Sequence, residues 1–392
     1  MRYELYRDAL ANVRKPCAFI DLDAFERNVA RVSRYACGVP VRLGSKSIRC
    51  VHLMRELLAR QATFSGVLCY TAEEAVWLSS RGLEDLVVAY PTWDSDQIRA
   101  VARAVKEGAQ ITLMADCAEH LERYASFARQ EDASLPVCLD LDMGTWHAGL
   151  YFGALRTTLR TEERVLELCA QIVASPHLVL DGLMGYEGQI AGTADAVPGE
   201  FLMNRIKRLL MARSAPQVVA RRERLVEAVR AAGHAPRFVN AGGSGSVKLN
   251  AGERAITEIT VGSAFYGPVL FNHYRDYDYE PAAGYAIEVV RRPAPHIFTC
   301  LGGGYPASGA PARAPTPWLP EGVRLHRFEG AGEVQTPIVY RGEVSLGPGD
   351  PVFLRHAKAG ELCERFQELH LIRGATLVEV VPTYRGQGVC FL

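Results

Sequence analysis

The stretch "VRLGSKSIRC" (residues 41–50) is typical of a buried strand that ends at a basic residue. Side chains alternate along a strand, so Arg42, Gly44 and Lys46 are expected on one face. Two cations in one packed space are costly unless something there needs them. The stretch therefore predicts a strand that carries a functional lysine at its end.

Similar apolar runs alternate with helical patterns from about residue 16 to residue 270. We take "CAFIDL" (17–22) as the first strand, "VRLGSK" (41–46) as the second and "RFVNAGG" (237–243) as the last. Near-continuous apolar strands between helices are typical of a parallel sheet covered on both faces. About eight such units in roughly 250 residues predict an α/β fold, a TIM (β/α)8 barrel over residues 16–270.

Beyond residue 270, helical periodicity nearly vanishes and β-type runs with Gly and Pro at the turns take over. Examples are "VQTPIVYRGEVSLGPGDPVFLR" (334–355) and "TLVEVVPTYRGQG" (376–388). This pattern predicts a second, mainly antiparallel β domain over residues 271–392. We assign residues 1–15 to the same domain, because "MRYELY" (1–6) is expected to add a strand to it.

The composition excludes several classes of protein. Lys plus Arg and Asp plus Glu are each 44, so the net charge is zero, which argues against a nucleic-acid or anionic membrane surface. We find no secretion signal and no apolar run of membrane-spanning length. Ten cysteines without CxxC pairs indicate reduced thiols, and therefore a cytoplasmic location.

Lys46 is the first candidate catalytic residue. Sites in TIM barrels form at the C-terminal ends of the strands, where Lys46 would stand. Arg42 behind it would disfavour the ammonium form, and a neutral amine is a nucleophile toward aldehydes. The alternative is a surface lysine whose stem packs on apolar neighbours.

The glycine-rich "NAGGSGSV" (240–247) follows the predicted last barrel strand. Its backbone N–H groups could hold a phosphate, and it matches neither a P-loop nor GxGxxG. A tight turn is the alternative. Together with Lys46, however, the loop suggests pyridoxal phosphate, which needs both an amine and a phosphate cradle.

At this point the chain resembles the alanine racemase-type, fold-type III pyridoxal phosphate enzymes. Within them it is most similar to the branch of D-threonine aldolases and D-serine dehydratases. The resemblance covers nearly the whole chain. It rests on "FIDLDAFERNV", on the spacing of Arg42 and Lys46, and on "DLDMGTWHAG", "GLMGYEGQ" and "NAGGSGS".

The resemblance implies a role for each matching residue. Lys46 would form the imine with the cofactor, and Tyr186, just past the predicted seventh strand, would lie beside the pyridine ring. An aromatic plug at the barrel rim is the alternative for Tyr186. The remaining cofactor-binding residues would be Arg42, Asn240, Gly243, Ser244 and Gly245, with the last three at the phosphate.

The chain departs from the family pattern in the barrel. Gly44 stands where a histidine is frequent, and "DMGTWHAG" places His147 where an arginine is usual. His147 is expected to bond the cofactor's phenolic oxygen or to take a proton, with a packed histidine as the alternative. Asp142 would orient a neighbour or cap a helix.

A second departure concerns a divalent metal. The branch carries a His-x-Asp or His-x-Cys pair that binds one, whereas this chain has His356 followed by Lys358 in "RHAKAGELCERF". An ammonium is no easy metal ligand, so our hypothesis is that Lys358 replaces the metal as the resident positive charge. A rival keeps a metal on His356 with Glu361 or Cys363. A solvated turn is the third possibility.

Arg385, in "TYRGQG" (383–388), stands where related enzymes also have Arg-Gly. Its guanidinium suits a substrate carboxylate, and a structural ion pair at a turn is the alternative.

The resemblance implies a lyase that cleaves D-configured β-hydroxy amino acids to an aldehyde and a smaller amino acid. The alternative is a dehydratase that releases a keto acid and ammonia. A racemase is less favoured because no tyrosine base can be picked out, and a non-catalytic cofactor carrier is disfavoured by the large β domain. Relatives form head-to-tail homodimers, and we expect the same here.

Overall fold

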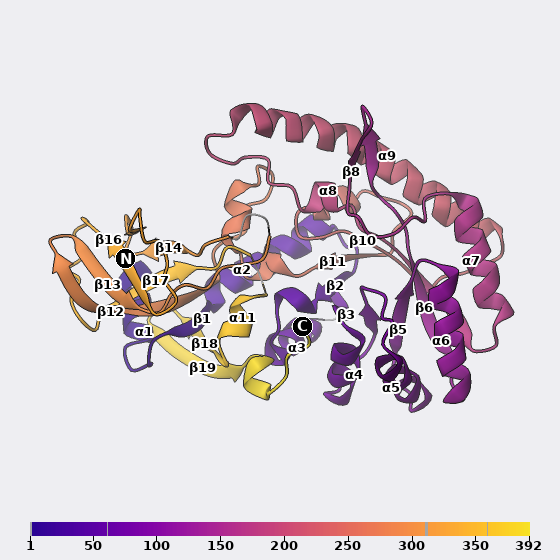
Figure 1. Cartoon of the computed structure of the whole chain (residues 1–392), viewed down its shortest axis with the longest axis horizontal. Coiled ribbons are helices and arrows are strands. Elements are labelled where there is room, and N and C mark those ends of the chain that lie inside the picture. Colours follow the sequence, from indigo (N-terminus) through magenta and orange to yellow (C-terminus); the bar gives the residue numbers. More distant parts are fainter. Residues whose placement is uncertain (1, 61, 310–312, 359) are drawn as a thin grey trace.

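The computed structural model describes residues 2–60, 62–309, 313–358 and 360–392. It contains a closed parallel barrel and, beside it, a nine-stranded sheet (Figure 1). This confirms the expected fold class. None of the described helices is long and apolar enough to cross a membrane.

Eight strands close the barrel, and each pairs in parallel with its neighbours. In barrel order they are β10 (Phe238–Ala241), β11 (Glu258–Val261), β2 (Val41–Gly44), β3 (Phe64–Cys69), β4 (Leu86–Val88), β5 (Ile111–Ala115), β6 (Leu135–Asp140) and β9 (Leu178–Gly185).

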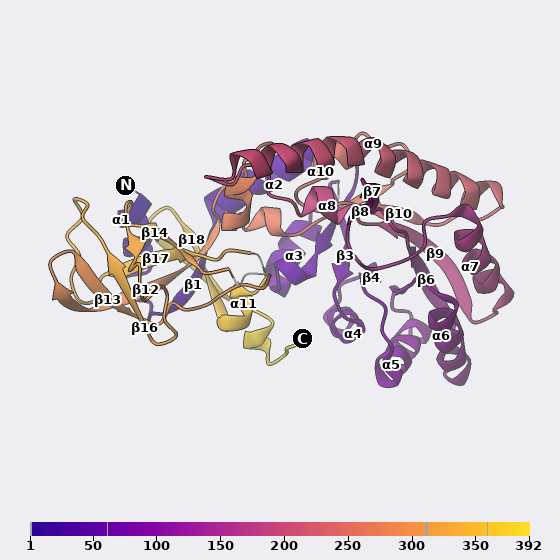
Figure 2. The ribbon, with the colours of Figure 1, turned by 45° about the horizontal axis from the view of Figure 1, so that its top comes forward.

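Helices cover the outside of the barrel because their apolar stripes pack on its strands. The longest, α9, lies along one side and extends toward the β domain (Figure 2). The barrel helices are α2 (Leu22–Ala36), α3 (Val51–Leu58), α4 (Ala72–Ser80), α5 (Ser95–Lys106), α6 (Ala118–Gln130), α7 (Glu162–Ala174), α8 (Gly188–Ala191), α9 (Phe201–Ala231) and α10 (Val247–Asn250).

The second sheet runs in the order β15-β16-β13-β12-β1-β18-β19, and β17 pairs with both β12 and β14. Its pairs are antiparallel except β1 with β18. The strands are β1 (Cys17–Asp21), β12 (Ala283–Ala294), β13 (Ile297–Leu301), β14 (Thr316–Leu319), β15 (Arg324–Leu325), β16 (Gln335–Val339), β17 (Pro351–Arg355), β18 (Glu368–Arg373) and β19 (Thr376–Pro382).

The barrel has the expected eight strands, but one of them differs from the prediction. The expected first barrel strand is β1, which lies in the second sheet, and the eighth barrel strand is β11, which the sequence analysis missed. Lys46 therefore follows the first barrel strand, Tyr186 the sixth and the glycine-rich loop the seventh.

The N-terminal segment is also different from expectation. Residues Arg2–Ala9 form helix α1 rather than a strand. Tyr3 and Tyr6 recur at helical spacing and both are buried. The Tyr6 hydroxyl donates to Asp21 (2.5 Å) and the Tyr3 hydroxyl donates to the Pro351 carbonyl (3.1 Å). These two bonds fix α1 on the second sheet.

Candidate active site

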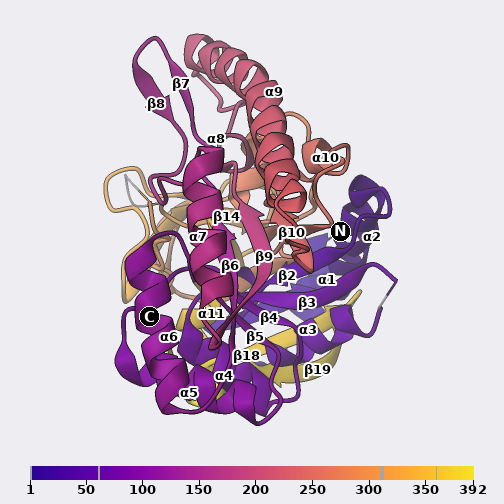
Figure 3. The same ribbon diagram turned by 90° about the vertical axis from the view of Figure 1, so that its right-hand side faces the viewer.

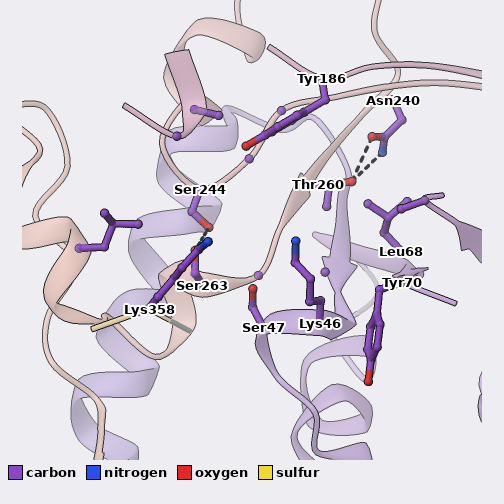
Figure 4. Close-up of a pocket in the computed structure, with 18 of the residues that line it drawn as sticks. Lys46, Ser47, Leu68, Tyr70, Tyr186, Asn240, Ser244, Thr260, Ser263 and Lys358 are labelled. Carbon is purple, nitrogen blue, oxygen red and sulfur yellow. Dashed lines mark hydrogen bonds between the residues drawn. The ribbon is translucent and has the colours of Figure 1, made fainter. Parts of the chain in front are cut away.

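A cavity of about 300 Å³ lies at the C-terminal ends of the barrel strands. Side chains from the barrel and from the β domain line it (Figure 4). Four basic residues face it: Lys46, Arg156, Arg313 and Lys358. The described lining residues include no Asp or Glu, so the cavity suits an anionic ligand.

Lys46 lies in a single 3₁₀ turn, Ser45–Ser47, directly after β2. Its ammonium donates to the Tyr90 hydroxyl over 3.3 Å. Burial tends to raise the pKa of Tyr90, but the charges of Lys46 and Arg156 outweigh it and lower that pKa. The lysine predicted from the sequence thus ends inside the cavity.

Arg42, which we expected to bind the cofactor, is not among the residues that line the cavity. Its side chain is fully buried in the barrel interior, where it pairs with Glu258 (2.6 Å) and Asp85 (2.9 Å). Two carboxylates neutralise its charge, so Arg42 is no unbalanced cation behind Lys46. These two carboxylates therefore remove the like-charge effect on Lys46 that we expected from the sequence.

Arg42 instead supports two residues that line the cavity, Asn240 and Thr260, through its ion pair with Glu258. The Asn240 amide donates to Glu258 (2.8 Å) and to Thr260 (2.9 Å). Thr260 returns a hydrogen bond to the Asn240 carbonyl oxygen (3.1 Å). Asn240 and Thr260 both line the cavity, so this network holds them in fixed orientations.

The glycine-rich loop supplies another wall. Gly243 and Ser244 line the cavity, and a Cβ at position 243 would lie 3.3 Å from the Tyr186 ring. Gly245 does not line it, but passes so close to the Ala191 carbonyl that a Cβ would lie 2.3 Å from that oxygen. The loop therefore needs glycine to pack where it does.

A buried charge network anchors this loop from behind. The Ser246 hydroxyl donates to Glu187 (2.6 Å), which pairs with Arg222 (2.6 Å). Arg222 also pairs with Glu253, and all three charged residues are buried.

Tyr186 lines the cavity, and burial raises the pKa of its hydroxyl to about 12. Arg156 lies 4.8 Å from the centres of both the Tyr186 and Tyr90 rings and donates to the Tyr90 hydroxyl (3.0 Å). Arg156 also lines the cavity, although no motif in the sequence pointed to it.

His147 does not line the cavity, so its expected role at the cofactor stays a prediction. It ends β7 (Thr145–His147), which forms a projecting hairpin with β8 (Leu150–Phe152) (Figure 3). Its ring shares a hydrogen bond with the Thr145 hydroxyl (2.9 Å). Asp142 accepts from the Gly144 backbone N–H (2.7 Å) and the Tyr151 hydroxyl (2.9 Å), so it anchors the hairpin base.

His356 is buried beside a second, small cavity that Lys358 and Glu361 also line. Neither ring nitrogen has a hydrogen-bond partner among the described residues. Burial, assisted by the charge of Arg355, lowers the pKa of His356 to about 3, so the ring is neutral at pH 7. Lys358 lines both cavities and reaches the one that contains Lys46.

Arg385 does not reach the cavity of its own chain. It is exposed in the 3₁₀ turn Arg385–Gln387, near the C-terminus. Its expected contact with a substrate carboxylate stays a prediction.

Within the described ranges, one group of three side chains could hold a metal ion, namely Asp116, Cys117 and His120. Their ligand atoms all lie within 4.8 Å of one another. Asp116 and Cys117 lie between β5 and α6, His120 lies in the first turn of α6, and the group includes neither His356 nor Glu361.

Residues 20–269 match the family described as alanine racemase, N-terminal domain. The chain belongs to this family. It is 26% identical over 258 residues to a 3-hydroxy-D-aspartate aldolase from Paracoccus denitrificans (strain Pd 1222), a match that covers 64% of this chain. The chain spans about 60% of the length of that curated relative.

Solved structures share the whole fold. A D-threonine aldolase from Filomicrobium marinum superimposes with a TM-score of 0.80 at 19% identity, covering 96% of each chain. A D-threo-3-hydroxyaspartate dehydratase from Delftia sp. HT23 gives 0.73 at 19% identity, covering 96% of this chain and 99% of that one. A cysteine-to-alanine variant of such a dehydratase, described as metal-free, gives 0.72 at 18% identity over 96% of this chain and 98% of that one.

The residues of the larger cavity fit pyridoxal phosphate. The cavity offers one lysine amine at a strand end, a glycine loop whose Gly243 leaves room beside Tyr186, and an excess of basic side chains. The Ser244 hydroxyl accepts from the Ala264 backbone N–H (3.0 Å) and bonds the Ser263 hydroxyl (3.1 Å), so it is fixed at the cavity wall.

Proposed function

We propose that this chain is a pyridoxal phosphate-dependent lyase that cleaves D-configured β-hydroxy amino acids to an aldehyde and a smaller amino acid. The observation that carries the proposal is the Lys46 ammonium inside a cavity walled by Gly243 and Ser244. Membership of the alanine racemase N-terminal domain family and the similarity to 3-hydroxy-D-aspartate aldolase support it.

Lys46 would hold the cofactor covalently, and the loop of Gly243 and Ser244 would hold its phosphate. When bound, the cofactor supplies an electron sink for a bond that breaks at the substrate Cα. Tyr186 and Asn240 would confine it laterally, and the bond from Asn240 to Glu258 keeps this contact rigid. Arg156 would hold Tyr90 beside Lys46 through the bond between their side chains.

We further propose that the substrate carries an acidic side chain. Arg156 and Arg313 line the cavity together with Lys46 and Lys358, and a guanidinium suits a second carboxylate. A 3-hydroxy-D-aspartate molecule would bring a second carboxylate to this site, and that compound is also named for the Paracoccus relative.

A dehydratase is the second candidate, because the whole chain also superimposes on D-threo-3-hydroxyaspartate dehydratase. Both reactions use the same cofactor and the same substrates, and they differ in which bond breaks. In the aldolase the Cα–Cβ bond breaks. In the dehydratase the Cα–H bond and the bond to the β-hydroxyl break.

The experiment is turnover by purified protein reconstituted with pyridoxal phosphate. D-Threonine, D-phenylserine, D-serine and 3-hydroxy-D-aspartate are each tested for aldehyde and for ammonia with keto acid. Aldehyde with the fastest turnover on 3-hydroxy-D-aspartate is the expected result. Ammonia with keto acid would identify a dehydratase, and no product from any of the four would favour a cofactor carrier.

We also propose that the protein is a cytoplasmic homodimer. All ten cysteines are unpaired, which fits a reducing compartment. The start of α9 exposes large apolar side chains that a second copy would cover: Phe201, Leu202, Met203, Ile206 and Leu209. Sedimentation should give a dimer, and a catalytically competent monomer would refute it.

A further inference from the structure

Backbone contacts hold Lys358 at the mouth of the barrel. The segment that carries Lys358 directly follows β17. The Val269 N–H donates to the His356 carbonyl (3.2 Å), and the Leu270 N–H donates to the Ala357 carbonyl (3.1 Å). Gly360 packs directly on the Lys46 carbonyl. Lys358 and Lys46 therefore point into one cavity from opposite domains (Figure 4).

The surroundings of Lys358 are mostly cationic. The charges that act on it most are those of Lys46, Glu361 and Arg313, two of which are positive. Among the described residues, Lys358 has no hydrogen-bond partner and no ion pair. An anionic or oxygen ligand would stabilise a half-buried ammonium in such surroundings.

A divalent metal does not fit beside it. The small cavity next to His356 offers two groups of ligand type, the His356 ring and Glu361 Oε2. The pair that binds a divalent metal in the branch has its second ligand two residues after the histidine, and in this chain that position is Lys358. The Cys363 thiol is already directed at the Ile48 carbonyl (3.4 Å), and Lys358, two residues after His356, can only donate while charged.

We propose that the Lys358 ammonium binds the oxygen on the substrate Cβ and takes the place of a divalent cation, so that the lyase needs no metal. This inference rests on the proposed function. An ammonium offers a full positive charge and three N–H donors, and a charge-assisted hydrogen bond to oxygen strengthens as negative charge develops there.

The first test is chelation of the reconstituted holoenzyme. We expect cleavage of 3-hydroxy-D-aspartate to continue at an unchanged rate after dialysis against a strong chelator. Metal content is measured in the wild type, in Cys117→Ser and in His356→Ala, so that metal held at Asp116, Cys117 and His120 is assigned separately. Metal retained in Cys117→Ser but lost in His356→Ala, together with metal-restored activity, would overturn the proposal.

The second test is Lys358→Met, with Lys358→Gln as the replacement if the first variant does not fold. We expect kcat/KM for 3-hydroxy-D-aspartate and for D-phenylserine to fall about 10²–10³-fold, as when one donor to a developing oxyanion is removed. The affinity for D-aspartate, which lacks the β-hydroxyl, is read from the cofactor absorbance and should change less than about twofold.

Lys106→Met, at an exposed lysine on α5, is the matched control and should behave as wild type. If Lys358→Met keeps wild-type kcat/KM, or loses affinity for D-aspartate equally, Lys358 does not act on the β-oxygen. Absence of lyase activity in the wild type would instead refute the proposed function, which is a separate outcome.

Discussion

Gly360 of the β domain lies directly against the backbone of Lys46 in the barrel. A Cβ at position 360 would lie 2.1 Å from the Lys46 carbonyl oxygen, and Gly360 has a φ of +96°. The same carbonyl accepts from Arg49 Nε (2.9 Å), and Arg49 pairs with Glu364 of the β domain. The turn that carries the candidate catalytic lysine is thus held from both domains.

Gly360→Ala should therefore lower the free energy of unfolding and the affinity for pyridoxal phosphate. Both losses should exceed what the left-handed backbone conformation of Gly360 alone would cause. Gly322→Ala is the control, because Gly322 has a similar φ of +89° but open space around it. A left-handed alanine costs about 1–2 kcal/mol, which is the loss of unfolding free energy expected for the control. Gly360→Ala should lose more and bind pyridoxal phosphate at least about tenfold more weakly. Equal effects of the two variants on cofactor affinity would contradict this view of the contact.

Arg42→Met should unfold more easily because it leaves Glu258 buried without its cation. Removing one partner of a buried ion pair costs about 3–5 kcal/mol, which denaturant unfolding can measure. Arg103→Met removes an exposed pair with Glu131 and should change the stability little. If the two variants were equally stable, the barrel interior would not depend on this network.

Glu74 predicts a specific pH dependence of stability. Burial raises its pKa from 4.5 to about 7, although hydrogen bonds from the Tyr70 N–H (2.6 Å) and the Tyr384 hydroxyl (2.8 Å) oppose this. Between these two values the folded state holds a proton that the unfolded state has lost, so stability falls as the pH rises from 4.5 through 7. The total loss from this group is about 3 kcal/mol.

In Glu74→Gln this part of the pH dependence should disappear, whereas exposed Glu73→Gln on the same helix should keep it. Unfolding free energies at several pH values between 4.5 and 8 give the comparison. Parallel curves for wild type and Glu74→Gln would show that Glu74 titrates normally.

The architecture could be predicted from the sequence, but not which strands form the barrel. β1 is buried at every position, and such a strand looks the same at the centre of a mixed sheet as in a parallel barrel. β11 escaped notice because it carries Glu258 and Thr260, polar residues that the barrel interior accommodates only through Arg42 and Asn240.

Only some of the residues that line the cavity could be predicted from the sequence. Four of the predicted residues line the cavity because each lies near or just beyond the C-terminal end of a barrel strand, a position that the chain order reveals: Lys46, Tyr186, Asn240 and Ser244. Arg156 could not be found this way. The hairpin of β7 and β8 lies between it and β6, so no spacing from a strand end points to the cavity.

The central claim is a covalent link between Lys46 Nζ and the aldehyde of pyridoxal phosphate. Borohydride reduction of the holoenzyme, followed by tryptic digestion and mass spectrometry, tests it directly. We expect the pyridoxyl group on the peptide of residues 43–49, with cleavage blocked at Lys46. A label on the peptide of residues 356–365, on any other peptide, or on none would contradict the account.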